Sequence, residues 1–443
     1  MPLLNRLPSI VTYSIIAVLS LHSEISAVEK PPKFGDSTWY GGGPYRVAAA
    51  DFTGDGILDL AIAYNRIGLL TVQKGDGRGG FTHLAQVAFE VPQPSVISGV
   101  YNLTVGDVDG DGRLDIACTP HGVPPNEWKD KDIPEVVLRS AWRGAAVIVR
   151  NLGNGQFQPI GEYVTTSLAV GVRLTDLDRD GKLDLLYTAR GSGYPGDLKV
   201  GILFLRPGRG DGTFGPAQEY EAGRSAYYVE TADFNEDGFP DIAVPNEHGD
   251  VAQVWISPGQ TIFNKPAELR RLTLKTTQIP GRRSHAVNDV RSGDVTGDGH
   301  VDLLTANLGT STVSIFAGNG DGTFQNDVLL EAGQNGAFLA IGDLNEDGRQ
   351  DFVITHWTEN FLSAFLNPGQ ARFADRVDYQ TGSGNYGVTL ADFDADGHLD
   401  AVTANYRDRT ISFLKGDGHG KFQNATTMKK GYHRFQGKWL AEE

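Results

Sequence analysis

Seven nine-residue segments of this chain repeat one pattern of oxygen-bearing side chains. Aspartate stands at positions one, five and nine of every copy, and position three is Asp, Asn or Thr. Position six is always glycine, which reaches the positive φ that lets a loop fold back on itself. Carboxylates at alternate positions suit Ca²⁺, which takes six to eight oxygen ligands. The pattern predicts one calcium site in each segment, about seven in all.

Position seven is predicted to supply a backbone carbonyl, because the side chains found there share no chemistry. The predicted calcium ligands are Asp51, Thr53, Asp55, Ile57, Asp59; Asp107, Asp109, Asp111, Arg113, Asp115; Asp176, Asp178, Asp180, Lys182, Asp184; Asp233, Asn235, Asp237, Phe239, Asp241; Asp294, Thr296, Asp298, His300, Asp302; Asp343, Asn345, Asp347, Arg349, Asp351; and Asp392, Asp394, Asp396, His398 and Asp400.

The charge of the chain agrees with bound cations. Its formal net charge is -16, and crowded carboxylates repel one another unless a cation neutralises them. No basic patch with interleaved aromatic residues is present, so nucleic acid is not an expected partner.

An EF-hand is the main alternative for such loops, and the sequence argues against it. That loop needs a Glu at position twelve and a helix on each side. Position twelve here is Ile62, Cys118, Tyr187, Val244, Thr305, Ile354 or Thr403, and the flanks are strand-like. The remaining alternative is a set of Asp/Gly turns without metal.

The flanking sequences predict the elements that hold these loops. Apolar residues alternate with period two on both sides of each segment, which is typical of a β-hairpin with the loop at its tip. A small residue always precedes position one, as expected of a strand crowded near a central axis. A further apolar run and a glycine turn closing on phenylalanine follow, as in VSIFAGNGDGTF, which ends at Phe324. Each repeat therefore supplies four strands.

Segments spaced 49 to 69 residues apart indicate a repeat architecture. Four-stranded sheets repeated radially are the blades of a β-propeller. The sequence therefore predicts an all-β, seven-bladed β-propeller with a calcium loop in each blade, formed by residues 28–443 as a single domain.

These motifs resemble the FG-GAP/VCBS repeat family, whose calcium-loop blades also build the head of integrin α-subunits. The resemblance covers about residues 34–430. It implies that positions one, three, five, seven and nine bind the ions at one end of the barrel, and that ligands approach the other end. The leg domains of integrins are missing, so the resemblance does not imply an integrin-like receptor role.

Two segments compete to close the ring. Residues 34–40 are expected to form an outer strand that pairs with the last blade. The C-terminal stretch FQNATTMKKGYHRF is the alternative for the same place.

Residues 1–27 are predicted to be a signal peptide. Arg6 precedes an apolar run from Ile10 to Leu21, which is too short to span a bilayer, and Ser26 and Ala27 follow it. The mature chain is therefore expected to be secreted, either extracellular or periplasmic, and not an integral membrane protein. The single cysteine, Cys118, lies in a predicted strand, where a buried inert thiol is expected.

The loops at the end away from the calcium sites are the expected ligand face. They combine aromatic rings with Asn, His and Arg, which suits sugars or peptides; the alternative is that the tyrosines pack between blades. The predicted ligand-face residues are Tyr45, Tyr101, Tyr228, His356, Trp357, Tyr386 and Tyr406.

The longest interruption of the repeat, residues 121–146, is expected to be a loop on this face that caps the central depression. His121, His248 and His356 occupy similar places in three blades and are candidates for a second metal site or an acid/base group.

The sequence thus favours a monomeric extracellular module for binding or adhesion, with a glycan or protein as its partner. A polysaccharide lyase is the rival, with Arg46, Arg66, Arg190 and Arg407 as candidates to neutralise a uronate. A structural protein of a surface layer or matrix is the third alternative.

Overall fold

The computed structural model describes residues 42–89, 96–123, 143–165, 167–191, 200–264, 269–279, 286–435 and 438–441. The predicted signal peptide at residues 1–27 and the predicted N-terminal closing strand at residues 34–40 lie outside these ranges.

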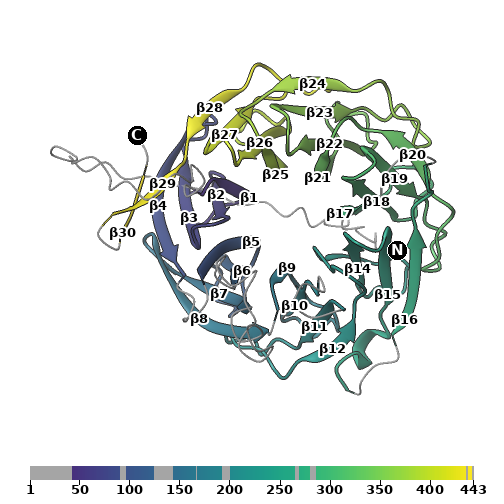
Figure 1. The fold of residues 1–443 in the computed structure, drawn as a ribbon, viewed down its shortest axis with the longest axis horizontal. Helices are drawn as coiled ribbons and strands as arrows, with labels where there is room; N and C mark the ends of the chain where they lie inside the picture. The colour runs from purple at the N-terminus through teal and green to yellow at the C-terminus, as the bar shows by residue number, and fades with distance from the viewer. Residues whose placement is uncertain are drawn as a thin grey trace, which may run out of the picture.

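Seven four-stranded antiparallel sheets form a ring in the part of the chain that the structure describes (Figure 1). Each sheet consists of four consecutive strands, so the predicted all-β, seven-bladed propeller is confirmed. The strands of blades 1 to 4 are β1 (Pro44–Ala50), β2 (Asp59–Tyr64), β3 (Leu69–Gly75), β4 (Phe81–Ala88); β5 (Val96–Gly106), β6 (Asp115–Val123), β7 (Arg143–Gly153), β8 (Gln156–Thr165); β9 (Ala169–Thr175), β10 (Asp184–Ala189), β11 (Ile202–Arg206), β12 (Gln218–Glu221); and β13 (Glu230–Ala232), β14 (Asp241–Asn246), β15 (Val251–Ile256), β16 (Arg270–Lys275).

The strands of blades 5 to 7 are β17 (Val287–Gly293), β18 (Asp302–Asn307), β19 (Thr312–Phe316), β20 (Val328–Glu331); β21 (Gly336–Gly342), β22 (Asp351–His356), β23 (Phe361–Phe365), β24 (Val377–Gln380); and β25 (Asn385–Ala391), β26 (Asp400–Asn405), β27 (Thr410–Leu414), β28 (Thr426–Lys429). A short 3₁₀ helix, η2 (Gly259–Thr261), follows β15, and a separate hairpin, β29 (Tyr432–Phe435) with β30 (Lys438–Ala441), follows β28.

The acidic segments lie at one turn in every blade. The residue before position one pairs with the position-nine aspartate, as Ala50 pairs with Asp59 and Ala232 with Asp241. Positions one to eight therefore connect the innermost strand to the second strand, as the period-two pattern predicts.

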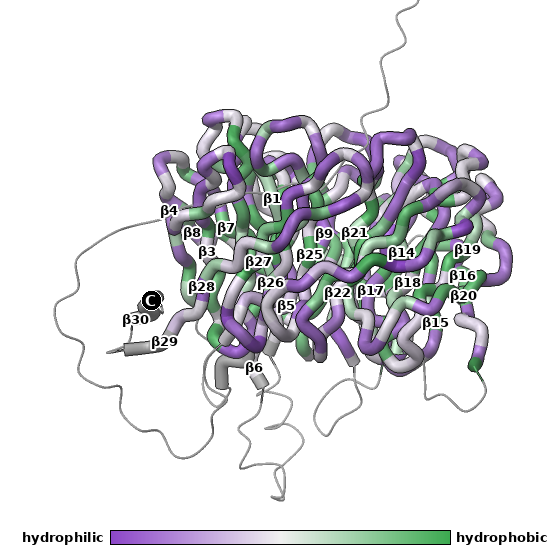
Figure 2. Tube along the Cα trace, turned by 90° about the horizontal axis from the view of Figure 1, so that it is seen from above, coloured by the Kyte–Doolittle hydropathy of each residue, from purple (hydrophilic) through white to green (hydrophobic). Residues whose placement is uncertain are grey.

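The hydrophobic core lies between neighbouring blades. One buried cluster joins Leu60 of blade 1, Leu103 of blade 2 and Val402 of blade 7. Seen from the side, the apolar strands occupy the middle of the disc and the polar loops gather at its two ends (Figure 2). Each blade thus buries its faces against the blades on either side.

The small residue before position one makes room for the next blade. A Cβ atom on Gly342 would lie 2.7 Å from Cδ1 of Leu399 in blade 7, and one on Gly106 would overlap Leu183 of blade 3 in the same way. At these two glycines the space is limited by a leucine from the loop of the next blade.

The C-terminal segment completes the ring. Thr426–Lys429, within the stretch FQNATTMKKGYHRF, forms the outer strand β28 of blade 7, which confirms the second of the two closing alternatives. The chain then crosses to blade 1, where the ring of Tyr432 packs 5.3 Å from that of Tyr64. Strand β1 lies against β25 at this junction.

Two further observations concern compartment and thiol chemistry. Among the described residues, no helix is long and apolar enough to cross a membrane. Cys118 is buried in β6, and burial raises the pKa of its thiol far above the usual range, as expected of an unreactive core residue.

Candidate cation loops and the opposite loop face

The position-one carboxylate is held by backbone amides in the same way in all seven loops. The N–H of the position-six glycine donates to it over 2.7 to 3.0 Å in every blade. Asp107 also accepts from the amides of Gly110 at 2.7 Å and Asp111 at 3.2 Å. The loop is therefore shaped by its own backbone around one carboxylate.

Position four is a structural requirement that the sequence reasoning missed. It has a positive φ in every loop, although it is glycine only at Gly54, Gly110 and Gly297. The other four loops place Arg179, Glu236, Glu346 and Ala395 there, with φ between 57° and 59°. Such backbone is unfavourable for residues with a Cβ by roughly 1–2 kcal/mol. The glycine at position four in three copies was the feature of the sequence that could have predicted this positive φ.

The position-nine carboxylate has a structural role in addition to its predicted place as a ligand. Asp351 is buried and accepts the N–H of Leu344 at 2.9 Å and that of Asn367 at 2.7 Å. The first donor lies in its own loop and the second at the end of the third strand. The same two bonds recur in every blade. Each position-nine aspartate thus links its loop to the sheet.

Burial also changes the acidity of these groups. Loss of water contact raises the pKa of Asp351 to about 6 and that of Asp400 to about 7, and the two backbone N–H donors only partly offset this effect. The pKa is raised for the same reason at all other position-nine carboxyls, Asp59, Asp115, Asp184, Asp241 and Asp302.

Three loops bring carboxylate oxygens close enough to share one cation. They are the loops with aspartate at position three, and in each the oxygens of positions one, three and nine lie within 4.8 Å of one another. The groups are Asp107, Asp109 and Asp115; Asp176, Asp178 and Asp184; and Asp392, Asp394 and Asp400. In the last group, Oδ1 of Asp394 is buried and has no hydrogen-bond partner among the described residues. An oxygen-only set of this kind fits a hard cation.

The position-five carboxylate stands apart from these groups. Its Oδ1 accepts the position-seven N–H in every loop, as Asp347 accepts from Arg349 at 3.0 Å. In three loops its other oxygen pairs with the basic side chain at position seven of its own loop, Arg113, Lys182 or Arg349. The structure therefore gathers the predicted ligands only in part.

At the opposite end, most aromatic residues of the predicted ligand face pack together across the axis. The ring of Tyr45 lies 4.4 Å from that of Tyr386 and 5.5 Å from that of Tyr101. The ring of Tyr228 in blade 4 lies 5.3 Å from Phe338 in blade 6. Tyr45 and Tyr228 are buried. These five rings, called the aromatic plug, pack against one another near the axis, and the sequence analysis did not single out Phe338.

Arg46 packs against the plug and connects non-adjacent blades of the ring. Its guanidinium stands 4.0 Å above the centre of the Tyr228 ring and 3.9 Å from that of Phe338. It also pairs with buried Asp289 at 3.4 Å, and Arg291 contacts the same carboxylate at 3.3 Å. Arg46 is itself only 5% exposed. It is therefore a structural residue, and not one placed to neutralise an anionic substrate.

A second candidate arginine is also committed to an ion pair. Arg190 pairs with Glu247, and its guanidinium lies 5.3 Å from the ring centre of Tyr227. Two of the four arginines proposed for a lyase are therefore already paired with carboxylates.

The accessible remainder of the ligand face lies over blades 6 and 7. Trp357, Tyr386 and Tyr406 are half-buried and Arg407 is exposed. The Arg407 guanidinium stands 5.6 Å from the centre of the Trp357 ring, and Tyr386 lies between Trp357 at 6.2 Å and Tyr406 at 5.8 Å. These four residues are called the Trp357 patch.

The three candidate histidines do not meet. His121 stacks on Tyr101 at 4.2 Å and is buried, which lowers its pKa to about 3. His248 Nδ1 lies 2.8 Å from the Ser225 hydroxyl. His356 is buried between the Gln334 carbonyl and the Ser363 hydroxyl, 2.8 and 2.9 Å away. These contacts of each histidine lie within its own blade.

The predicted cap at residues 121–146 is shorter than expected. Strand β6 continues to Val123 and β7 begins at Arg143, so both ends of the segment belong to the sheet of blade 2. The part between them, residues 124–142, lies outside the described residues.

A ring of seven four-stranded blades with an acidic loop at each inner hairpin defines a β-propeller built from acidic-loop repeats. The family model for FG-GAP-like repeats matches residues 51–118, 132–187, 294–354 and 343–403, together more than half of the chain. The chain belongs to the FG-GAP-like repeat family.

Solved structures show the same fold at low sequence identity. The periplasmic gluconolactonase PpgL of Pseudomonas aeruginosa is 15% identical, with a TM-score of 0.52 over 88% of this chain and 96% of its own. A protein from Lactobacillus plantarum is 11% identical, with a TM-score of 0.50 over 88% and 98%. BBS1N, from its complex with ARL6DN, is 9% identical, with a TM-score of 0.51 over 87% and 92%. No curated protein matches the sequence.

Proposed function

We propose that this chain is a calcium-stabilised β-propeller that acts outside the cell as a binding module for a glycan or protein. The observation that carries the calcium proposal is the grouping of three carboxylates within 4.8 Å in each of three loops. The shared backbone scaffold of the loops supports extending it to all seven blades. Calcium would neutralise carboxylates that otherwise repel one another, and the position-nine aspartate would transmit that stabilisation to the sheet.

The binding proposal rests on the Trp357 patch. It offers partly exposed aromatic faces next to an exposed guanidinium, a combination that stacks on and hydrogen-bonds to sugars or peptides. Tyr386 also belongs to the aromatic plug, where contacts with Tyr45 and Phe338 hold its ring in place, so little side-chain freedom is lost when a ligand binds. The paired arginines and separate histidines favour a binding module over a lyase.

Calcium dependence is tested by thermal unfolding in chelator and in millimolar Ca²⁺. A ligand that binds only the folded state stabilises it by about 2.7 kcal/mol per site at a hundred times its Kd. We expect the Tm to rise by many degrees in Ca²⁺ and much less in Mg²⁺, which demands a tighter octahedral shell. Identical melting curves with and without Ca²⁺ would reject the calcium proposal.

Ligand binding is tested on a glycan array with the purified protein, with Ca²⁺ and with chelator. We expect Trp357→Ala and Arg407→Ala to lose binding while their Tm stays near that of the wild type, because aromatic and arginine anchors dominate binding energy. Tyr220→Ala, on the outer strand β12, is the matched control. Unchanged binding in both patch variants would reject this surface as the ligand site.

A further inference from the structure

Blades 2 and 7 carry a basic side chain at one equivalent position near the end of the third strand: Arg150 lies within β7, and Lys415 directly follows β27. Arg150 in blade 2 precedes Asn151, whose N–H donates to position nine, Asp115, at 2.8 Å. Lys415 in blade 7 precedes Gly416, whose N–H donates to its own position nine at 2.8 Å. Because the residue after each of them makes the same hydrogen bond, Arg150 and Lys415 occupy equivalent positions in their blades.

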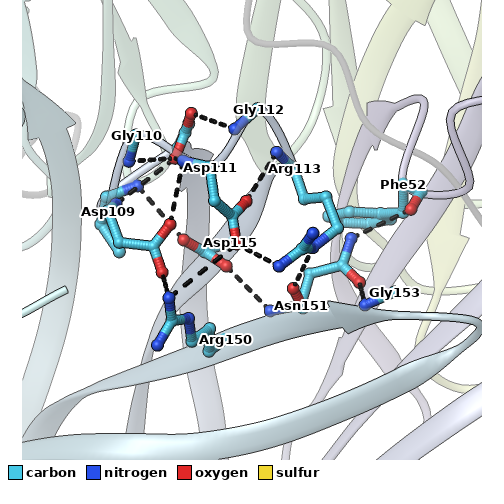
Figure 3. A network of polar contacts seen from close by, with 12 residues as sticks. Phe52, Asp109, Gly110, Asp111, Gly112, Arg113, Asp115, Arg150, Asn151 and Gly153 are labelled. Carbon is cyan, nitrogen blue, oxygen red and sulfur yellow. Dashed lines mark hydrogen bonds and ion pairs between the residues drawn. The ribbon is translucent and has the colours of Figure 1, made fainter. Parts of the chain in front are cut away.

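Both side chains extend into the acidic loop of their own blade. The Lys415 ammonium contacts position three, Asp394, and lies 2.6 Å from position five, Asp396. The Arg150 guanidinium contacts position three, Asp109, and lies 3.9 Å from position five, Asp111 (Figure 3). A single positive charge thus meets the two carboxylates that calcium would use at positions three and five.

Blade 3 provides the natural contrast. Its loop has the same four aspartates as the loops of blades 2 and 7, but Pro207 occupies the equivalent strand position, before Gly208. The residues at this position in blades 4, 5 and 6 are Ile256, Ala317 and Leu366, which also have no charge. In blade 1 the residue is Lys74, which contacts position five alone.

The basic residues at position seven are a different case. Arg113 and Lys182 pair with position five of their own loops and contact no position-three carboxylate. They are also more exposed, with side chains at 42% and 41%, against 33% for Arg150 and 32% for Lys415. Among the described residues, only Arg150 and Lys415 contact both position three and position five of a loop.

We propose that Arg150 and Lys415 are tethered cations that take the place of calcium in the loops of blades 2 and 7 when free calcium is low. This inference rests on the proposed binding of calcium by these loops. A calcium ion must displace the tethered charge and then share the loop with it, so the two loops bind calcium on the order of tenfold more weakly than the loop of blade 3. Blades 7, 1 and 2 are contiguous and include the junction that closes the ring. The blades on either side of blade 1, at the junction that closes the ring, are therefore less dependent on calcium than blade 3.

The test is hydrogen exchange measured by mass spectrometry across a series of buffered free Ca²⁺ concentrations. Peptides that cover residues 107–115, 176–184 and 392–400 report a protection midpoint for each loop. In the wild type, the midpoints of the first and third peptides should lie about tenfold above that of the second. In the double variant R150M/K415M they should fall to the midpoint of residues 176–184, while that loop stays unchanged.

Arg113→Met is the matched control, because it removes a cation that pairs with position five and donates to the Asn151 carbonyl but contacts no carboxylate at position three. It should leave the midpoint of residues 107–115 within about twofold of the wild type. Equal midpoints in the three wild-type loops, or a double variant without a shift, would overturn the tethered-cation inference and leave calcium binding intact. No calcium-dependent protection in any loop would overturn the calcium proposal as well. The comparison between wild-type loops needs no variant, so a failure of R150M/K415M to fold leaves the test decisive.

Discussion

Replacement of Asp351 separates the two roles of the position-nine aspartates. If this residue only binds an ion, its loss has no consequence in chelator. If it links loop to sheet as the geometry indicates, its loss destabilises the protein without any metal present. Asp347, at position five of the same loop, is the comparison.

The expected magnitude follows from the two hydrogen bonds of Asp351. Each is a bond from a backbone N–H to a buried carboxylate, at 2.9 and 2.7 Å, and a bond to a charged group contributes about 1.5–3 kcal/mol. Asp351→Ala leaves both donors unpaired, so the free energy of unfolding should fall by about 3–5 kcal/mol. Asp351→Asn keeps one acceptor and should lose about half as much. Asp347 is partly exposed and water can replace its bonds, so Asp347→Ala should cost less than about 1 kcal/mol.

The assay is urea unfolding of the variants in chelator, followed by the same measurement in millimolar Ca²⁺. In Ca²⁺ both alanine variants should lose the stabilisation that the blade 6 loop contributes, and only Asp351→Ala should carry the additional loss seen in chelator. Equal stability of wild type, Asp351→Ala and Asp347→Ala in chelator would refute the structural role.

Three further predictions concern the axis and the core. Arg46→Met should lower the free energy of unfolding by about 3 kcal/mol in urea titrations, because buried Asp289 loses one of its two cationic partners and retains Arg291 and the N–H of Leu339. A change below about 0.5 kcal/mol would contradict a structural role for Arg46. Burial lowers the folded-state pKa of His121 to about 3, below the usual value of 6.5, so the unfolded chain binds the proton first as pH falls and stability is lost below about pH 6.5. Between pH 7 and pH 5 in chelator, the free energy of unfolding of the wild type should therefore fall by about 2 kcal/mol more than that of His121→Phe. Parallel pH profiles of the two proteins would show that the ring is not held neutral. Cys118 should react with a thiol reagent only in unfolding concentrations of denaturant, and rapid labelling of the native protein would mean that β6 opens locally.

The number of blades and the position of each acidic loop could be predicted because both depend on local pattern. Period-two alternation specifies strands, and the run of Asp and Gly specifies the turn between the two inner strands. Seven copies give seven blades without any knowledge of contacts between them. The scaffold around position one forms from residues within six positions of each other, so it too is encoded locally.

The roles that the sequence did not reveal involve partners distant in the chain. The sequence assigns Asp351 only as a calcium ligand, whereas the structure shows that it also accepts the N–H of Asn367. The sequence places Arg46 and Tyr45 in a loop, but they contact Asp289 and Phe338 of non-adjacent blades and are buried at the centre of the ring.

The sequence by itself determined the repeat, the strands and the oxygen-rich loops, because these arise from the spacing of residues a few positions apart. Only the tertiary structure decided which residues pack near the central axis, which segment closes the ring and which acidic loops are contacted by Arg150 or Lys415. Closing seven blades into a circle brings residues from opposite sides into contact, and no local spacing records which of them will meet. Several residues of the expected binding face are therefore buried in the aromatic plug, and the Trp357 patch is the part of that face that stays accessible.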